Sequence, residues 1–400
     1  MTIERLRGPR PKVVIAGGGV AGLEAALALR HHAVERVELE LISPSRHFVY
    51  KPLATAERFG VGETLRFDVE RIAADCGAAY RPDALASVDS AAKRVWTRAG
   101  EAVDFDALVI ACGARMRPGF PGALTFWGGS WVSVDEAAFS TLLKQIERGG
   151  LSDLIFALPG GANWPLPLYE LALLSAARAG DGSGLSITIV TPEAAPLAMF
   201  GTPASERIAE LLAERGITVL TNTYPEAVEN GHLRLVPSGR LAADRVVTLP
   251  RLEGRRIGGV PHDRDGFIDV DPHGAVHGLT DVYAAGDGIA FGIKQGGIAT
   301  QQADAVAEHI AARAGAPIEP RPFSPVLRGL LLTGGAPRFL RHEATGGKGE
   351  AAVMDTSALW WPPGKIAGRF LAPYLATGAN HALEPPPAGE GAVPVVVELA

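Results

Sequence analysis

The first hydrophobic segment of the chain is a run of strand type that leads directly into a glycine-rich turn. Residues 12–16 are Lys-Val-Val-Ile-Ala, and residues 17–22 have the spacing Gly-x-Gly-x-x-Gly. An alanine- and leucine-rich run over 23–30 follows and predicts a helix. A strand, a glycine turn and a helix in this order predict the start of a βαβ unit that binds a dinucleotide.

Apolar segments of strand length alternate with segments of helical periodicity through most of the chain. In the first part, strands are predicted at 37–42, within 78–97 and within 105–114. A second set begins near residue 151, with strands and helices in turn at 154–158, 168–179, 185–190, 204–215 and 217–220. Alternation of this kind predicts parallel sheets covered by helices. We therefore expect an α/β fold with two Rossmann-like domains and a small C-terminal region.

A third feature is a strand within 279–287 that ends in Gly-Asp. It is followed by a glycine-rich turn and a predicted helix over 298–312, whose apolar positions lie on one face. Prolines become frequent beyond residue 316, and the last twenty residues read as a flexible tail. A discontinuous first domain is predicted at 11–115 and 255–316, and a second Rossmann domain at 116–254. A C-terminal domain is predicted at 317–380, and the tail at 381–400.

Composition narrows the class of protein. A chain of 400 residues with 47% hydrophobic and 20% charged residues predicts two or three globular domains. The net charge of −6 gives no reason to expect nucleic acid as a partner. The only cysteines are Cys76 and Cys112, so no dithiol or zinc site of Cys-pair type is predicted. No signal segment or membrane-span pattern is present, so we expect a cytoplasmic protein, with peripheral membrane contact left open.

Each glycine of the first turn has a predicted role. Gly17 permits the tight turn, Gly19 lets the backbone approach a pyrophosphate, and Gly22 lets the helix pack closely. The N–H groups that open the helix, at Val20 and Ala21, would face the phosphates. Nucleotide folds usually carry an acidic residue after the second strand to hold the ribose, whereas this chain has Ser43, a weaker acceptor.

Together these features resemble the flavoprotein superfamily with two dinucleotide-binding domains. The first glycine motif matches its FAD pyrophosphate site, and the turn Ala111-Cys112-Gly113 matches the small-residue turn that follows a later strand. The late Gly286-Asp287 pair matches the carboxylate that holds the FAD ribityl chain. The resemblance implies bound FAD and an oxidoreductase that acts on small molecules.

Finer features resemble the branch of sulfide:quinone oxidoreductase and type II NADH dehydrogenase. The segment 48–53 is similar to one that passes the flavin there, which implies a flavin contact for Lys51; a solvated loop lysine is the alternative. Lys294 and Gly297 belong to a segment similar to Lys-Thr-Gly, and both are expected to lie at the flavin pyrimidine edge, where Lys294 would stabilise the reduced form. The segment 359–365 occupies the position of a quinone-facing or membrane-facing part, although packing is the favoured role of its two tryptophans.

Two departures from that branch limit the prediction. No cysteine follows position 112, so persulfide chemistry on cysteine is not supported, and Cys112 itself reads as a packed residue. In the second domain, residues 159–167 contain three prolines and Trp164 where a second glycine motif is expected, although Glu170 and Glu193 keep nicotinamide binding open. We predict an FAD-dependent oxidoreductase that passes two electrons from an unidentified donor to an acceptor such as a quinone. The alternatives are an NAD(P)H dehydrogenase of the same fold and a non-catalytic flavin-binding redox sensor.

Overall fold

A parallel sheet forms the first half of the protein. The computed structural model describes residues 5–6, 10–128, 133–161, 164–180, 182–343 and 352–377. The sheet has the order β20-β9-β1-β2-β5, and all neighbouring strands run parallel. Its strands are β1 (Lys12–Ala16), β2 (Glu38–Ile42), β5 (Ala78–Arg81), β9 (Ala107–Ile110) and β20 (Val282–Ala284). Because β20 pairs with β9, the late Gly-Asp turn lies at the same sheet edge as the first glycine turn.

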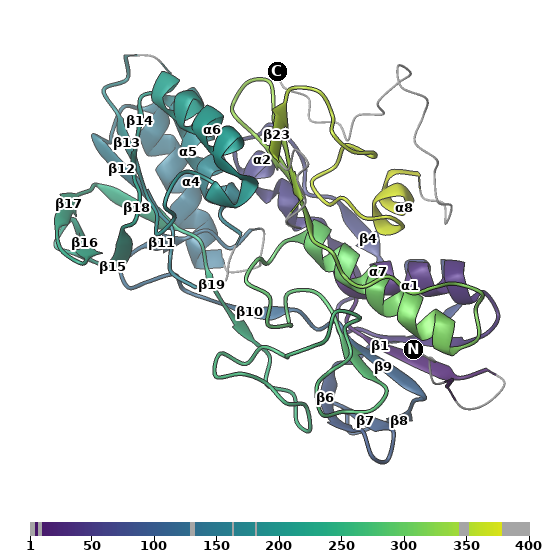
Figure 1. Ribbon diagram of the computed structural model, residues 1–400. Helices are drawn as coiled ribbons and strands as arrows, with labels where there is room; N and C mark the ends of the chain where they lie inside the picture. The colour runs from purple at the N-terminus through teal and green to yellow at the C-terminus, as the bar shows by residue number, and fades with distance from the viewer. Residues whose placement is uncertain are drawn as a thin grey trace.

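Two long helices pack against each other over this sheet. They are α1 (Val20–Ala33) and α7 (Gly296–Arg313), which lie side by side in Figure 1. Their contact is rich in small buried residues such as Ala25, Ala28 and Ala303, which allow the two backbones to approach closely. Residue Gly286 sits between the helices with φ +83°, and a Cβ there would lie 2.9 Å from Cβ of Ala21. The glycine is therefore required for this close approach.

A second parallel sheet forms the other half, with the order β11-β18-β12-β13-β14. Its strands are β11 (Leu124–Thr125), β12 (Asp153–Ala157), β13 (Ser186–Val190), β14 (Ile217–Leu220) and β18 (Arg245–Thr248). The helices α4 (Ser133–Glu147), α5 (Leu166–Ala179) and α6 (Thr202–Glu214) belong to this half. An antiparallel pair, β10 (Ala114–Arg117) with β19 (Arg251–Gly254), joins the two halves. The predicted α/β fold with two Rossmann-like sheets is confirmed.

Several small sheets were not predicted as such. They are built from short strands, whose pairing depends on partners across turns. They are β3 (His47–Val49) with β4 (Arg66–Asp68), β6 (Leu85–Asp89) with β7 (Arg94–Thr97) and β8 (Ala102–Asp104), and β15 (Tyr224–Glu229) with β16 (His232–Val236) and β17 (Arg240–Ala242). The short helices α2 (Ala54–Arg58) and α3 (Val69–Asp75) connect strands of the first half.

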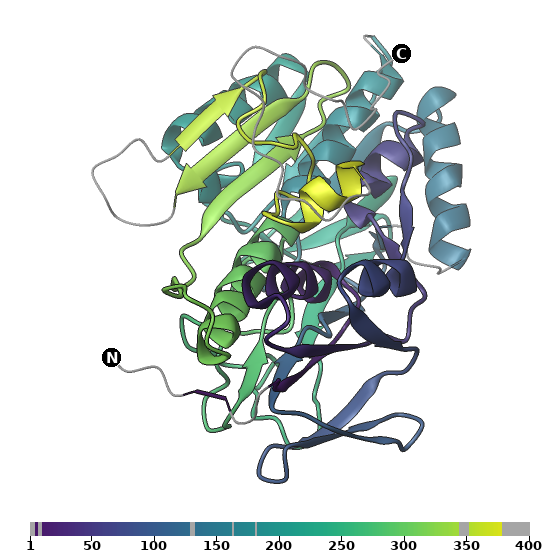
Figure 2. The ribbon, with the colours of Figure 1, turned by 90° about the vertical axis from the view of Figure 1, so that its right-hand side faces the viewer.

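The C-terminal region is a three-stranded antiparallel sheet followed by one short helix. Its elements are β21 (Val326–Leu331), β22 (Arg338–Glu343), β23 (Ala352–Asp355) and α8 (Leu371–Thr377). Figure 2 shows these strands above α7 and beside the helices of the second half. Leu327 and Leu331 share a core with Leu166 and Phe200 of that half. The predicted tail over 381–400 lies outside the described residues.

A pair of carboxyl groups holds the C-terminal segment on α1 and α7. Glu24 is fully buried, and its carboxylate accepts hydrogen bonds from the N–H groups of Phe370 and Leu371 at 2.9 and 2.6 Å. Asp304 of α7 is hydrogen-bonded to Glu24. A Cβ on Gly368 would lie 2.8 Å from a carboxylate oxygen of Glu24, so the segment approaches closely only with glycine there.

The free energy of unfolding is expected to fall as the pH rises through the range in which this pair titrates. Burial raises the pKa of Glu24 from 4.5 to about 7 and holds that of Asp304 well above its usual range. The folded pair keeps protons that the unfolded chain releases, so the stabilisation present at low pH is lost as the pH rises toward 7. Asp304→Asn should flatten this fall. Urea midpoints at about pH 5 and about pH 8 check it, and equal falls in both proteins would contradict it.

Candidate active site

One large cavity collects most of the residues that the sequence points to. It has a volume of about 950 Å³ and is lined by both halves of the protein and by the C-terminal region. Of the predicted site residues, Gly22 and Gly297 do not line it. The others do, namely Gly17, Gly19, Val20, Ala21, Ser43, Lys51, Cys112, Gly113, Gly286, Asp287 and Lys294. Residues more than 250 positions apart in the sequence thus meet around one space, as the closeness of β1, β9 and β20 requires.

The glycine turn after β1 forms one end of the cavity. Gly17 has φ +129°, and a Cβ there would lie 2.1 Å from the carbonyl oxygen of Ala111. Gly22 packs on the same turn, since its Cβ would lie 1.8 Å from the carbonyl oxygen of Gly17. A Cβ on Gly19 would meet nothing within 4 Å, so its backbone borders open space. The N–H groups that open α1 at Val20 and Ala21 have no partners within the helix, which suits an anionic group in that space.

Asp287 lies in the cavity between two lysines. Burial raises the pKa of its carboxyl group, while the charges of Lys294 and Lys51 lower it. None of the described residues donates a hydrogen bond to this carboxylate, so it is available to hydroxyl groups of a ligand. The side chain of Lys294 is 6% exposed; its Nζ donates to the carbonyl oxygen of Ile289 and lies 3.9 Å from the centre of the Phe267 ring. Burial lowers the pKa of Lys294 to about 8.

Two predicted site residues have local partners. Cys112 donates from Sγ to the carbonyl oxygen of Ala16 at 3.3 Å, and burial raises its pKa to about 11. It is therefore a protonated, packed thiol near neutral pH rather than a nucleophile. The hydroxyl of Ser43, which is 1% exposed, donates to the carbonyl oxygen of Ser45 at 3.1 Å. That bond uses the hydrogen of the Ser43 hydroxyl. A contact of Ser43 with a ribose therefore stays a prediction.

A buried ion pair in the wall of the cavity was not predicted. Lys365, which lines the cavity, places Nζ 2.5 and 2.7 Å from the two carboxylate oxygens of Glu170 on α5. The Lys365 side chain is 6% exposed and that of Glu170 is fully buried. Glu170 also accepts hydrogen bonds from Thr55 Oγ1 at 2.7 Å and from the N–H of Leu332 at 3.0 Å. Burial lowers the pKa of Lys365, and the charge of Glu170 acts in the opposite direction.

The start of α5 differs strongly from the start of α1. Pro167 lacks an N–H group, and the N–H of Leu168 donates to the carbonyl oxygen of Pro165 at 2.9 Å. Trp164 lines the cavity and packs on Phe200 with ring centroids 5.8 Å apart. This helix start therefore offers few donors to a second pyrophosphate.

The two acidic residues expected to keep a nicotinamide site open have separate positions. Glu170 is committed to its buried partners and is not available to a ribose. Glu193 follows β13 and accepts hydrogen bonds from Tyr169 Oη at 2.7 Å and Thr191 Oγ1 at 2.9 Å. Its Oε1 is buried with no hydrogen-bond partner among the described residues. Burial raises the pKa of Glu193. One carboxylate oxygen at the usual ribose position is thus unpaired.

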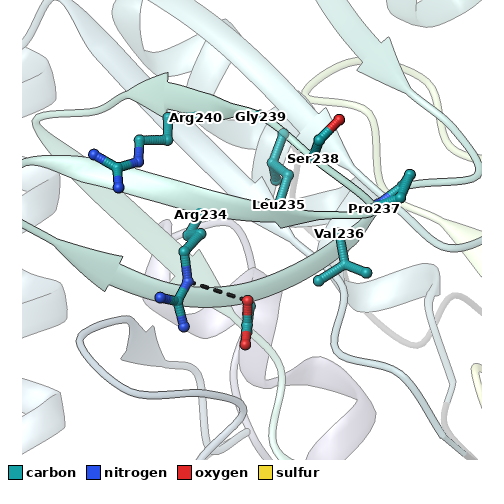
Figure 3. Close-up of a pocket in the computed structure, with 8 residues that line it drawn as sticks. Arg234, Leu235, Val236, Pro237, Ser238, Gly239 and Arg240 are labelled. Carbon is teal, nitrogen blue, oxygen red and sulfur yellow. Dashed lines mark ion pairs between the residues drawn. The ribbon is translucent and has the colours of Figure 1, made fainter.

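Four other features of the described residues lie outside the cavity or do not form a site. Trp360 packs on Phe339 at 5.1 Å between ring centroids, and neither Trp360 nor Trp361 lines the cavity. A second depression lies on the sheet β15–β17, where Arg234 pairs with Glu226 on an open surface (Figure 3). Among the described residues, no cluster of side chains suits a metal ion. No helix in the described part of the chain has the length and apolar character to cross a membrane.

Residues 11–303 match the model of the pyridine nucleotide-disulphide oxidoreductase family. The chain belongs to this family. Its members are FAD-dependent oxidoreductases, so the cofactor expected from the sequence is the family's cofactor. The match includes the glycine turn after β1, the Ala111-Cys112-Gly113 turn and the Gly286-Asp287 turn.

Two relatives with names of quinone reductases are similar to the chain in sequence, and a solved structure is similar to it in fold. It is 26% identical over 264 residues to a sulfide-quinone reductase of Aquifex aeolicus, covering 61% of this chain and 59% of that protein's length. It is 26% identical over 300 residues to demethylphylloquinone reductase NdbB of Synechocystis, covering 70% of this chain and 72% of that protein. The crystal structure of the Aquifex sulfide:quinone oxidoreductase superposes with a TM-score of 0.76 at 19% identity, covering 86% of each chain.

The cavity fits FAD. Open space beside Gly19 and the N–H groups that open α1 suit its pyrophosphate, and the unpaired carboxylate of Asp287 suits the hydroxyls of its ribityl chain. A side chain at position 19 would fill the space that the pyrophosphate needs. Lys294, Lys365 and Trp164 line the same cavity, whose remaining volume is available to the flavin ring and a reaction partner. The start of α5 does not form an equivalent pyrophosphate cradle.

Proposed function

We propose that the protein passes an electron pair from FAD to a quinone-type acceptor, and that Lys365 supplies a proton to that acceptor. The observation that carries the proposal is the position of Lys365: a buried ammonium group that lines the cavity and is held by Glu170. A buried cation with a perturbed pKa in the wall of a ligand cavity is characteristic of a functional site. The curated relatives named as quinone reductases support the choice of acceptor.

The reaction needs two electrons and two protons for each quinone reduced to a quinol. FAD, when bound and already reduced by the donor, would supply the electron pair. Lys365 can donate one proton to the developing oxyanion of the acceptor, because burial lowers its pKa and makes its ammonium a better acid. The second proton comes from the flavin or from solvent. The carboxylate of Glu170 orients the lysine and favours its reprotonation after each turnover.

Lys294 has a separate proposed role at the flavin. Together with the start of α7 at Gly296, it would stabilise the negative charge that the reduced ring carries. Gln295 caps this helix, since its Oε1 accepts a hydrogen bond from the N–H of Ile298 at 2.8 Å. A lipid-soluble acceptor would require peripheral contact with a membrane.

In this proposal, the protein does not take electrons from its donor through a cysteine persulfide. Cys112 is the only cysteine that lines the cavity, and its thiol is protonated and bonded to a carbonyl. A nicotinamide donor is the second candidate, which would make the protein an NAD(P)H dehydrogenase. The unpaired Oε1 of Glu193 favours it, as does the fold of NDH2 from Plasmodium falciparum in complex with NADH, with a TM-score of 0.55 at 18% identity. The donor-poor start of α5 speaks against tight binding.

NADH is expected to reduce the flavin slowly. The start of α5 lacks N–H groups that a pyrophosphate needs, so NADH should bind weakly. The measurement is the visible spectrum of the purified protein after anaerobic addition of NADH. Rapid bleaching of the flavin band would contradict the expectation and identify a dehydrogenase.

Oxidation of the reduced flavin tests the proposed function itself. Protein reduced anaerobically with dithionite is expected to regain its flavin band when mixed with menadione, at a rate that rises with menadione concentration. A protein that binds flavin only as a sensor would be reoxidised slowly by every quinone tested.

A further inference from the structure

Arg328 of β21 (Val326–Leu331) is one of the residues that line the cavity. It is half-buried, and among the described residues no side chain forms an ion pair or hydrogen bond with its guanidinium group. Its partner in the strand register is Arg341 of β22, which pairs with Glu343. Burial and the charge of Arg341 lower the pKa of Arg328, and the charge of Glu343, which is already paired with Arg341, acts in the opposite direction. A cation removed from water without a partner is costly, so this side chain is suited to an anion from outside the protein.

The cavity carries a surplus of positive charge, and Arg328 is part of that surplus. Eight of the lining residues are lysine or arginine, and Asp287 is the one acidic residue among them. Glu170 neutralises Lys365, and Asp287 lies beside Lys294. The two negative charges of an FAD pyrophosphate belong at the glycine turn after β1. Arg328 belongs to a different wall, since its carbonyl oxygen accepts a hydrogen bond from Gln295 Nε2 at 3.0 Å where α7 begins.

The neighbours of Arg328 define what else a ligand must offer. Leu330 and Trp164 line the same cavity, and so does Gly329, where a Cβ would lie 2.8 Å from Leu166. This part of the wall is therefore apolar and aromatic, with one guanidinium group in it. A flat apolar molecule that carries an anionic group at one edge would satisfy both.

We propose that Arg328 is a specificity-determining residue that selects an acceptor bearing an anionic group, such as a carboxylate or a sulfonate. The inference rests on the proposed function for the identity of the ligand as an acceptor. Arg328 binds the charged edge through its planar guanidinium group, and the apolar wall contacts the ring system. A neutral ring of the same size has no partner for the guanidinium group and binds more weakly.

Equilibrium binding tests the inference without any electron transfer. Naphthalene sulfonate, which is redox-inert, is titrated into the oxidised holoenzyme, and binding is followed by the change in the flavin spectrum, with methylnaphthalene as the neutral match. The wild type is expected to bind the sulfonate about tenfold more tightly than Arg328→Gln does, with the neutral ligand unaffected. Equal affinities of the two proteins for the sulfonate would overturn the inference.

Arg341→Gln is the matched control, because Arg341 is the register partner of Arg328 and does not line the cavity. It should keep the preference for the sulfonate. The flavin midpoint potential of Arg328→Gln separates a role toward the acceptor from a role toward the flavin. An unchanged potential is expected, and a lowered potential with equal loss of both ligands would overturn the inference.

In stopped-flow reoxidation, Arg328→Gln should lose the preference for naphthoquinone sulfonate over menadione. If no quinone reoxidises the wild type, the proposed function fails while the binding result still decides the role of Arg328.

Discussion

Asp287→Ala is expected to give a folded protein that contains almost no flavin. Asp287 offers the one acidic side chain in the cavity, and no described residue donates to it, so its bonds are available to the ribityl hydroxyls of FAD. Removing a charged acceptor from several hydrogen bonds costs roughly 1.5–3 kcal/mol for each bond, enough to reduce FAD affinity by more than about tenfold. The measurement is the ratio of flavin absorbance to protein absorbance after purification, with circular dichroism to establish folding.

Asp269→Ala is the control for this loss, because its side chain is 76% exposed and it does not line the cavity. It should keep its full flavin content. Asp287→Asn keeps the size and one acceptor oxygen, so an intermediate content is expected. A fully flavinated Asp287→Ala protein would contradict the role of Asp287.

Lys365→Met is expected to slow the oxidation of the reduced flavin by quinone about a hundredfold or more, the typical contribution of a positioned proton donor. Reduction of the flavin by dithionite should be unaffected, because Lys365 acts on the acceptor. The substitution leaves Glu170 as an unpaired buried charge, which costs roughly 3–5 kcal/mol of stability. The fold therefore has to be checked by thermal unfolding before the rates are compared.

The double variant Lys365→Met with Glu170→Gln separates catalysis from stability. It removes both charges from the buried site, so most of the stability should return, while the slow reoxidation should persist. Recovery of the wild-type rate in the double variant would mean that the lysine serves the fold and not the acceptor. In the wild type, the reoxidation rate should also fall at high pH, as the ammonium group is lost.

The parts of the site that lie within one short stretch of chain could be predicted from the sequence. The Gly-x-Gly-x-x-Gly turn is local, because the strand, the turn and the helix that it needs are consecutive. Asp287 could be placed through the resemblance of its strand and turn to a known family. The positions of Gly17, Gly19 and Asp287 in one cavity then follow from the order of strands in a parallel sheet.

The parts that depend on distant pairing could not be predicted. Lys365 and Glu170 are 195 residues apart, and their contact arises only because the C-terminal region packs on the second half of the protein. Arg328 belongs to a short strand with no distinctive pattern, and its lack of a partner is visible only once every neighbour is placed. Glu24 reads as an ordinary polar position on a helix, although it is fully buried beneath Phe370 and Leu371. For the proline-rich start of α5, the loss of N–H donors was predicted from the prolines. The contacts of Trp164 and Leu168 there were not predicted, because they depend on the packed structure.

An anaerobic titration of the reduced protein with menadione decides whether the reduced flavin passes its electron pair to a quinone. The flavin band and the quinol formed are measured together after each addition. The flavin band is expected to return in full after one quinone for each flavin, with one quinol produced. A flavin band that stays bleached with excess quinone present, and returns only when oxygen is admitted, would contradict it.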